Sequence, residues 1–405
     1  MLAQFVDSSA APNLTPAELS IRGAEEALAK HSDQSLNYNA LAMALARRAR
    51  ETSHVRYYAE AEEALQKSFK LAPQNFEALK VQAWLLLGRH EFAKALELAT
   101  QLNRQVPDDL TVYGYLADAN AELGNYDAAE NAAQWMLDLR PGNVAGLTRG
   151  AYLRELYGNL PGAIELMKLA YDATSFQEFE DRAWILTQIA HIYLISGDLQ
   201  KAEIHAKDAL ELFANYHYAL GTLAQIRVAQ RRYAESCDLF QQRYAEAPNA
   251  ENLYALAEAL TLAKRRNEAR KLFLEFEQKA LNESTLPDNA NHELIAYYID
   301  HALKPRTALD LAKQEISRRH DVYTLDAYAW ALAANGDYQS ANKEIERALS
   351  VGVKDPKLLY HAGSISLHLN DLSKARTYLK DAETRYSLEA SKVLESFPAL
   401  QASNQ

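Results

Sequence analysis

The sequence predicts an all-α fold, an α-solenoid in which helix-turn-helix repeats of about 34 residues stack in a row. Pro73, Pro107 and Pro141 follow one another at intervals of 34 residues, and small apolar residues recur at the same interval. The composition agrees, because 48% of the residues are hydrophobic while Gly and Pro number only 14 and 11, few for a protein of strands and turns. One helix pair cannot bury its apolar face alone, so each repeat must pack on its neighbours.

The first element expected from the N-terminus is a helix over residues 16–30. Thr15 can cap it, Pro16 suits the first helical position, and Glu18 can reach back to the cap. We expect residues 16–34 to form a capping helix or half-repeat that covers one end of the stack. Residues 1–15 are expected to be a flexible leader.

A small residue in the second helix of each repeat aligns the array. The aligned positions are Ala61, Ala95, Ala129, Ala163, Ala202, Ser236, Ala269, Ala308, Ala341 and Ala375. Successive positions are 33 or 34 residues apart, except for two steps of 39 residues. Extensions near residues 175–181 and 282–289 account for the longer steps. The alignment predicts about ten repeats over residues 35–385.

The turn inside each repeat carries residues that end one helix and begin the next. The matching pairs are Gly124-Asn125, Gly158-Asn159, Gly197-Asp198, Gly336-Asp337 and, in the last repeat, Asn370-Asp371. Gly can take the left-handed conformation that ends a helix, and Asn or Asp can cap the helix that follows. Gly88 comes two residues early in the second repeat, so we expect its turn to be displaced.

Residues 386–405 are expected to hold a second capping helix and a tail. Ser387 can cap a helix that runs to Phe397, and Pro398 would end it. With both ends of the stack covered, the sequence favours a monomer over end-to-end assembly.

Two repeats show the order of large and small residues most fully. They contain Leu186, Ile189, Ala190, Tyr193, Gly197, Ala202, Ala206 and Ala209, and Leu325, Tyr328, Ala329, Leu332, Gly336, Ala341, Ile345 and Ala348. In this order the chain resembles the tetratricopeptide repeat (TPR) proteins. The resemblance covers residues 35–385. It implies a right-handed superhelix of about ten helix-turn-helix TPR units, with the first helix of every repeat lining a concave groove.

The resemblance also implies that repeat positions 2, 5, 6, 9, 12 and 13 face the groove. They select as candidate groove residues Trp84, Tyr115, Asp118, Arg149, Tyr152, Gln188, His191, Tyr218, Gln225, Tyr254, Glu258, Tyr297, Asp300, His301, Asp326, Trp330, Tyr360, His361 and His368. This set is mainly aromatic and acidic, and aromatic side chains are frequent in binding hot spots. The same rings can instead fill helix–helix seams, because a register slip of one residue rotates a side chain by roughly 100°.

One binding mode of the family, the basic clamp for the C-terminal carboxylate of a chaperone, is not present. The clamp needs Lys and Asn in one repeat, Asn in the next, and Lys and Arg in the third. Here Lys80 is followed by Trp84, Tyr115 stands in the place of Asn, and Ala145 in the place of Lys, so only Arg149 remains. Chaperone-tail recognition is therefore not expected.

The charge balance limits the partners. The chain has 54 acidic and 43 basic residues, a net charge of −11, and no dense run of Lys and Arg. Nucleic-acid binding depends on basic side chains that neutralise phosphates, so no nucleic-acid partner is expected. A protein or peptide of neutral or basic character suits this balance. No apolar run reaches the roughly 18 residues that span a bilayer, so no membrane insertion is expected.

Sequence motifs of catalysis are lacking. No nucleophile elbow, phosphate loop or dinucleotide fingerprint occurs, and the repeats leave no room for a separate catalytic domain. We expect no enzymatic activity and no cofactor. Cys237 is the only cysteine, which excludes an internal disulfide.

We interpret the chain as a non-enzymatic scaffold or adaptor that binds a protein or peptide segment in its concave groove. Self-assembly into a structural oligomer is one alternative. Another is a ligand- or metal-sensing module built from Asp300, His301, Asp326, His361 and His368, although no metal site is assigned because no HExxH or Hx3H spacing occurs. Residues 1–13 lack the features of a signal peptide. The compartment stays open between the cytoplasm and, for a chain whose signal has been removed, the periplasm or the exterior.

Overall fold

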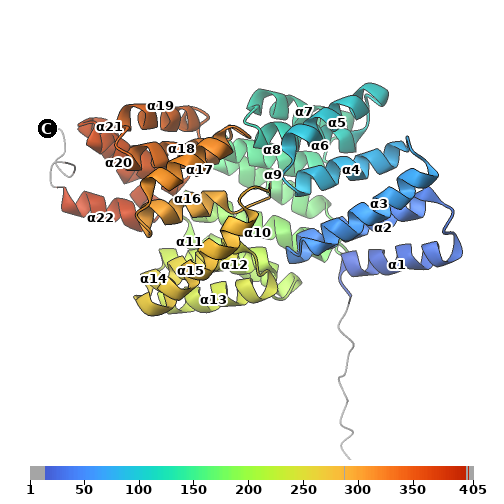
Figure 1. Cartoon of the computed structure of the whole chain (residues 1–405), viewed down its shortest axis with the longest axis horizontal. Coiled ribbons are helices and arrows are strands. Elements are labelled where there is room, and N and C mark those ends of the chain that lie inside the picture. Colours follow the sequence, from blue (N-terminus) through green and yellow to red (C-terminus); the bar gives the residue numbers. More distant parts are fainter. Residues whose placement is uncertain (1–13, 287, 398–399, 401–405) are drawn as a thin grey trace, which may run out of the picture. The chain divides into compact units, whose positions relative to one another are not determined.

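The computed structural model describes residues 14–286, 288–397 and 400, and their regular structure consists of α-helices α1 to α22 (Figure 1). No strand occurs in these residues. The chain divides into two compact units, residues 1–81 and 82–405. Most of the expected leader lies outside the described residues. The all-α solenoid predicted from the sequence is confirmed.

One helix precedes and one follows ten helix pairs in the described sequence. These outer helices are α1 (Pro16–Lys30) and α22 (Leu388–Ser396). The first helices of the pairs are α2 (Ser35–Thr52), α4 (Phe76–Gly88), α6 (Leu110–Glu122), α8 (Val144–Leu156), α10 (Phe179–Ser196), α12 (His217–Ala229), α14 (Ala250–Leu262), α16 (Asn291–Asp300), α18 (Val322–Ala334) and α20 (Pro356–His368). The second helices are α3 (Arg56–Leu71), α5 (Phe92–Gln105), α7 (Tyr126–Leu139), α9 (Leu160–Ala173), α11 (Leu199–Leu212), α13 (Tyr233–Glu246), α15 (Arg266–Glu283), α17 (Pro305–Ile316), α19 (Tyr338–Leu349) and α21 (Leu372–Thr384).

The capping chemistry predicted for both terminal helices is confirmed. The Thr15 hydroxyl accepts a hydrogen bond from the backbone N–H of Glu18 (3.2 Å), and the Glu18 carboxylate accepts one from the N–H of Thr15 (2.9 Å). The Ser387 hydroxyl accepts a bond from the N–H of Ala390 (3.3 Å) at the start of α22. Pro398, expected to end that helix, lies outside the described residues.

The small residues that aligned the repeats are all buried. Each of the ten is at most 3% exposed, and Ala129 has no exposed surface. A methyl or hydroxymethyl group at these places lets neighbouring helices approach closely, while the larger apolar side chains fill the space around it. The repeat alignment read from the sequence therefore corresponds to the packing of the core.

The glycines expected to end the first helices have the left-handed conformation, with φ between 74° and 89° at Gly124, Gly158, Gly197 and Gly336. The prediction that the turn after Gly88 is displaced is wrong, because the turn keeps its place in the repeat. Gly88 is the last residue of α4, and His90 takes the left-handed place with φ 58°. The left-handed conformation costs a residue other than glycine about 1–2 kcal/mol. The hydrogen bond from the N–H of Glu91 to Leu86 O (2.8 Å) closes the turn and holds His90 there.

The two extensions lengthen helices. The helix α10 has 18 residues where most other first helices have 13, and α15 has 18 where most other second helices have 12 to 14. The first extension therefore adds to the start of a first helix. The second adds to the end of a second helix and is followed by the connection of residues 284–290.

Turns of the earlier repeats in the second compact unit lie against connections about six repeats later, and we call these four contacts the turn contacts. The first joins His90 Nδ1 to Asp288 Oδ1 at 3.5 Å. The fourth joins the hydroxyl of Tyr386, as donor, to Gly197 O at 3.3 Å. The second and third lie at residues 122–126 with 319–322 and at residues 157–158 with 352. Repeats distant in sequence are thus in direct contact.

The second turn contact is mainly polar. The guanidinium of Arg319 lies 3.3 Å from the carboxylate of Glu122, and the N–H of Val322 donates to the hydroxyl of Tyr126 at 2.9 Å. Burial is the main reason why the pKa of Glu122 is raised to about 7. Arg319 also lies 3.4 Å from Asp321, which caps α18. This segment therefore connects α6 to the start of α18.

The third turn contact depends on two glycines. A Cβ atom added to Gly158 would lie 2.5 Å from Gly352 O, and one added to Gly352 would lie 2.8 Å from Tyr157 O. Both glycines also have positive φ, at 74° and 111°. The backbones can approach this closely only because neither residue has a side chain.

Replacing Gly158 by Ala should destabilise the protein more than the same change at Gly336. Both positions are left-handed, which costs an alanine about 1–2 kcal/mol. At Gly336, however, a Cβ would meet no atom within 4 Å, whereas at Gly158 the overlap adds about 1–3 kcal/mol. Urea denaturation of Gly158→Ala and Gly336→Ala measures the difference. Equal losses of unfolding free energy would contradict the third turn contact.

Candidate functional site

The candidate groove residues meet in pairs across successive first helices. The pairs are Asp118 with Arg149 (2.5 Å), Glu155 with His191 (3.2 Å), Glu258 with His301, Asp300 with Trp330 (3.3 Å), and Asp326 with His361 (2.7 Å). In each pair except the second, both members belong to the candidate set. The first helices therefore share one face on which polar side chains of adjacent repeats contact each other.

The candidate residues differ widely in exposure. Tyr115, Tyr297, Asp326 and His361 are buried, while Gln225, Asp300 and His368 are exposed. The half-buried members are Trp84, Asp118, Arg149, Tyr152, Gln188, His191, Tyr218, Tyr254, Glu258, His301, Trp330 and Tyr360. Half-buried side chains can contribute both to packing and to contact with a ligand.

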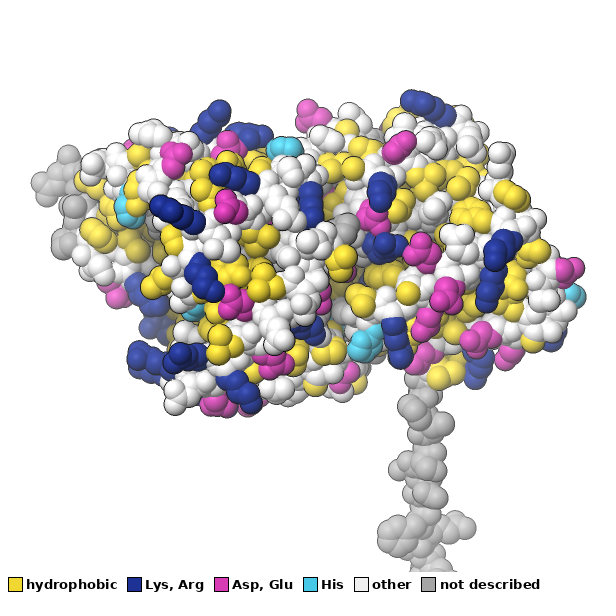
Figure 2. All heavy atoms as spheres, viewed as in Figure 1, with side chains coloured by type: hydrophobic (Ala, Val, Ile, Leu, Met, Phe, Trp, Pro, Cys, Tyr) yellow, Lys and Arg dark blue, Asp and Glu magenta, His cyan; other side chains and the backbone are white. Residues whose placement is uncertain are grey.

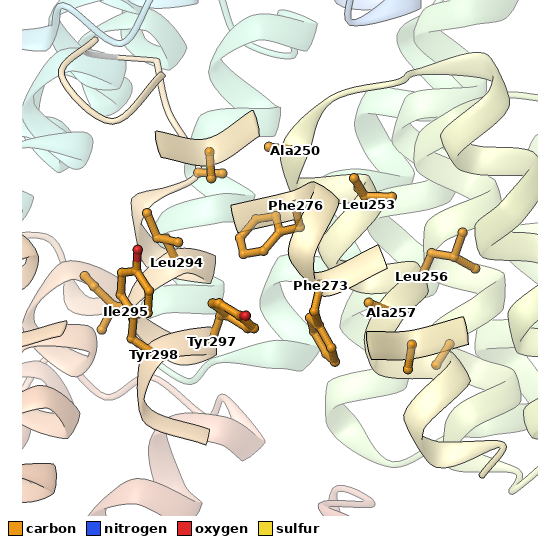
Figure 3. Close-up of a cluster of buried hydrophobic side chains, with 14 of the residues drawn as sticks. Ala250, Leu253, Leu256, Ala257, Phe273, Phe276, Leu294, Ile295, Tyr297 and Tyr298 are labelled. Atoms are coloured by element: carbon orange, nitrogen blue, oxygen red, sulfur yellow. The ribbon is translucent and has the colours of Figure 1, made fainter. Parts of the chain in front are cut away.

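Tyr297 is a core residue, contrary to its expected place in the groove. Its ring lies 5.4 Å from Phe273 and 5.8 Å from Phe276, centroid to centroid, and Figure 3 shows the three rings close together. Only 6% of Tyr297 is exposed, and it belongs to the hydrophobic cluster that holds Phe273 and Phe276 of α15. Tyr115 is likewise buried, at 5% exposure, because neighbouring helices cover that side of α6.

The cluster of histidines and aspartates considered for the alternative metal-sensing module does not form. His361 bonds to Asp326 and stacks on Trp330 with centroids 4.1 Å apart, whereas His368 stacks on Tyr338 of α19. His301 pairs with Glu258. Across the described residues, no group of three or more His, Cys, Asp and Glu side chains is arranged to hold a metal ion. The histidines of this region belong to separate packed pairs.

A pocket of about 460 Å³ lies between the first helices of the later repeats, and we call it the C-terminal pocket. Its walls come from α12, α13, α14, α16, α18 and α20. Four carboxylates line it, from Glu251, Glu293, Asp326 and Asp355. The permanent cations of the lining are Arg243 and Lys357, and its aromatic residues are Tyr254, Tyr323, Trp330, His292 and His361.

Three of the four carboxylates in the C-terminal pocket have partners. Glu251 pairs with Arg243 at 3.2 Å, and Asp326 bonds to His361. Asp355 caps α20 by accepting from the N–H groups of its first turn at 2.8 and 3.0 Å. Glu293 forms no ion pair with any cation of the described residues. It is therefore the carboxylate best placed to meet a ligand.

Burial changes the protonation of two neighbours in this pocket. It raises the pKa of Glu293 to about 7, and the negative charge of Glu251 adds to the rise. It lowers the pKa of His292 to about 4, with a further contribution from the positive charge of Arg319. Near neutral pH, His292 is uncharged and Glu293 exchanges between its neutral and charged forms.

Four residues of the pocket lining are missing from the candidate groove residues although they occupy groove positions of their repeats. Repeat position 2 is taken by Glu251, Tyr323 and Lys357, and position 5 by Glu293. The rule that repeat positions 2, 5, 6, 9, 12 and 13 face the groove therefore covers them. Asp355, one residue before its repeat begins, and Arg243, on a second helix, lie outside the rule. Only the packing of α13 and the start of α20 bring these two side chains to the pocket.

The surface outside the pocket shows no concentration of basic charge on the face in view. Figure 2 shows Lys and Arg side chains interspersed with Asp and Glu over that face. None of the described helices has the length and hydropathy needed to cross a lipid bilayer.

Two family profiles match the sequence, and both are described as tetratricopeptide repeat. One matches residues 80–144 and 327–390, and the other matches residues 185–216. No curated protein matches the chain.

Several solved structures are similar to the chain. A human IFIT1 dimer with m7Gppp-AAAA has a TM-score of 0.53 and 15% identity, over 91% of this chain and 86% of that one. A human IFIT1 dimer with PPP-AAAA has a TM-score of 0.51 and 14% identity, over 90% and 94%. The APC/C hetero-tetramer Cut9-Hcn1 gives 0.48 and 13%, over 93% of this chain but only 58% of that chain's length. At these identities the likeness concerns the fold alone.

Replacing Glu293 by Gln should remove a pH-dependent loss of stability. The folded-state pKa of Glu293 is raised, so the folded protein binds more protons than the unfolded chain between pH 4.5 and about 7. Its contribution to stability is therefore present at low pH and is lost as pH rises through that window. Relative to wild type, Glu293→Gln should gain unfolding free energy from pH 4.5 to 8.

Chemical denaturation at several pH values measures this gain. The control is Glu275→Gln, which removes an exposed carboxylate from α15 and should differ from wild type by a constant amount. A constant difference for Glu293→Gln as well would contradict the raised pKa.

Proposed function

We propose that this chain, a tetratricopeptide repeat protein, is a non-enzymatic scaffold or adaptor that holds a segment of another protein on the shared face of its first helices. The observation that carries the proposal is the C-terminal pocket of about 460 Å³. Its size admits side chains of a protein segment, and its lining combines aromatic rings with polar groups. Such a lining provides large contact area and fixes orientation through a few polar contacts.

Trp330 is the residue most suited to anchor the segment. It is half-buried in the lining of the pocket. Its indole N–H donates to Asp300 at 3.3 Å and its ring stacks on the buried His361, so the ring is fixed before a partner arrives. A pre-ordered aromatic side chain loses little entropy on binding, which favours a binding hot spot.

Capture of a terminal carboxylate by the earlier repeats is disfavoured. Arg149, the one residue that remains of the basic clamp, is engaged within the protein. Its guanidinium donates to the Asp118 carboxylate at 2.5 Å, to Ala145 O at 3.0 Å and to Gly114 O at 3.1 Å. An incoming carboxylate would compete with Asp118 for its charge.

Nucleic acid is a less favoured partner. The similar human IFIT1 structures are complexes with m7Gppp-AAAA and PPP-AAAA, which concerns that protein. In the present chain the pocket is lined by four carboxylates and two permanent cations. A phosphate chain would meet repulsion there, because binding of nucleic acid relies on neutralising cations.

Replacing Trp330 by Ala should leave the fold intact and weaken capture of the natural partner. Loss of a hot-spot aromatic costs about 2 kcal/mol or more, which is roughly thirtyfold in affinity. Quantitative affinity capture from a native cell extract, with identification by mass spectrometry, gives the measurement. A partner enriched on wild type should be depleted on Trp330→Ala.

The matched control is Trp135→Ala. Trp135 lies on a second helix, α7, and is 51% exposed, so its loss removes an exposed indole away from the pocket. Equal capture by wild type and Trp330→Ala would overturn the assignment of the binding face. Tyr297→Ala is unsuitable, because removing a core ring costs about 3–5 kcal/mol of stability.

A further inference from the structure

We infer that the C-terminal pocket binds the cationic end of a lysine or arginine side chain of the partner segment, with Glu293 as its counter-charge and Glu251 beside it. This inference rests on the proposed function, because it specifies the chemistry of the segment held on the same face. It identifies the occupant by charge and not by sequence.

The first step is the position of the two glutamates. Glu251 lies in the first turn of α14 and Glu293 in the first turn of α16, the next first helix. Both line the pocket, and the negative charge of Glu251 helps to raise the pKa of Glu293. A cation placed between two carboxylates that repel each other stabilises the charged form of both.

The second step is that no cation of the described residues forms an ion pair with Glu293, although the positive charges of Lys357 and Arg319 act on it from a distance and lower its pKa. Arg243 is held by Glu251 at 3.2 Å, and Lys357 is exposed at the start of α20. His292 is neutral near pH 7, with its Nε2 3.1 Å from the hydroxyl of Thr324. The lining thus carries a net negative charge that its own residues do not neutralise.

The third step is the aromatic wall. Tyr254, Tyr323 and Trp330 line the same pocket as the two glutamates. Aromatic faces attract ammonium and guanidinium groups, and the stem of a long basic side chain packs on apolar surface. A lysine or arginine side chain satisfies both parts of the lining, whereas an acidic side chain satisfies neither.

Protonation gives the inference a distinct signature. Near pH 7 a part of the Glu293 population is protonated, because burial raises its pKa. A bound cation favours the charged carboxylate, so binding releases a proton from that part of the population. Affinity for a cation should therefore increase between pH 6 and pH 8. The charged or titratable groups of the pocket lining, together with the nearby Arg319 before α18, are Arg243 of α13, Glu251 and Tyr254 of α14, His292 of α16, Tyr323 and Asp326 of α18, Asp355 before α20, and Lys357 and His361 of α20.

The test uses the full chain and fluorescein-labelled hexalysine as the probe, followed by fluorescence anisotropy at low salt. Wild type should bind the probe, and Glu293→Gln should weaken binding roughly tenfold at pH 8, which corresponds to about 1.4 kcal/mol. The exposed-carboxylate control Glu275→Gln should change binding less than about twofold, as expected for surface charge. The gain in affinity from pH 6 to 8 should be present in wild type and absent from Glu293→Gln.

Three results would overturn the inference. Hexalysine without measurable binding would exclude the cation site, and equal losses in Glu293→Gln and Glu275→Gln would show attraction to the acidic surface as a whole. Displacement of the probe by free spermine at equal charge would assign the site to a small cation. None of these results would affect the prediction that Trp330→Ala loses partner capture. Failure of the cation site is therefore distinguishable from failure of the proposed function.

Discussion

The turn contacts between early repeats and connections about six repeats later are the constraint on which the rest of the second compact unit depends. In a solenoid each repeat ordinarily touches only its neighbours, so small changes of angle accumulate along the array. Here the backbones at Gly158 and Gly352 approach too closely for any side chain. Arg319 and Val322 bond to residues almost two hundred positions earlier in the chain. These contacts restrict the angles between all the repeats that lie between them.

The second turn contact also reaches the C-terminal pocket. Arg319 pairs with Glu122 of α6, and its guanidinium lies 3.5 Å from Nε2 of His292, which lines the pocket. The charge of Arg319 helps to keep His292 neutral, and Asp321 beside it caps α18. One short segment thus takes part in both the contact with α6 and the wall around Glu293. Arg319 also acts on Glu293, whose pKa its positive charge lowers.

Local chemistry made much of the fold predictable from the sequence. The cap at Thr15, the left-handed glycines and the buried small residues each follow from a few neighbouring residues. The turn contacts did not follow, because they depend on rotations summed over six repeats. His90 showed that a turn can keep its place without glycine. Tyr297 lies in the core because its ring packs against Phe273 and Phe276 of α15, a contact that the positional rule does not contain. Glu293 occupies an expected groove position, but only the three-dimensional arrangement shows that no cation in the described part of the chain forms an ion pair with it.

Hydrogen exchange of the Arg319→Gln variant, compared with wild type by mass spectrometry, tests most directly whether the turn contacts hold the pocket. The variant keeps a polar side chain but loses the charge that pairs with Glu122. If the contacts act as described, amides will exchange faster both around residues 122–126 and in α16 and α18. Amides of α11, which contributes no residue to the pocket or to the second turn contact, will be unchanged. Faster exchange confined to residues 316–322 would contradict the dependence of the pocket on the turn contacts.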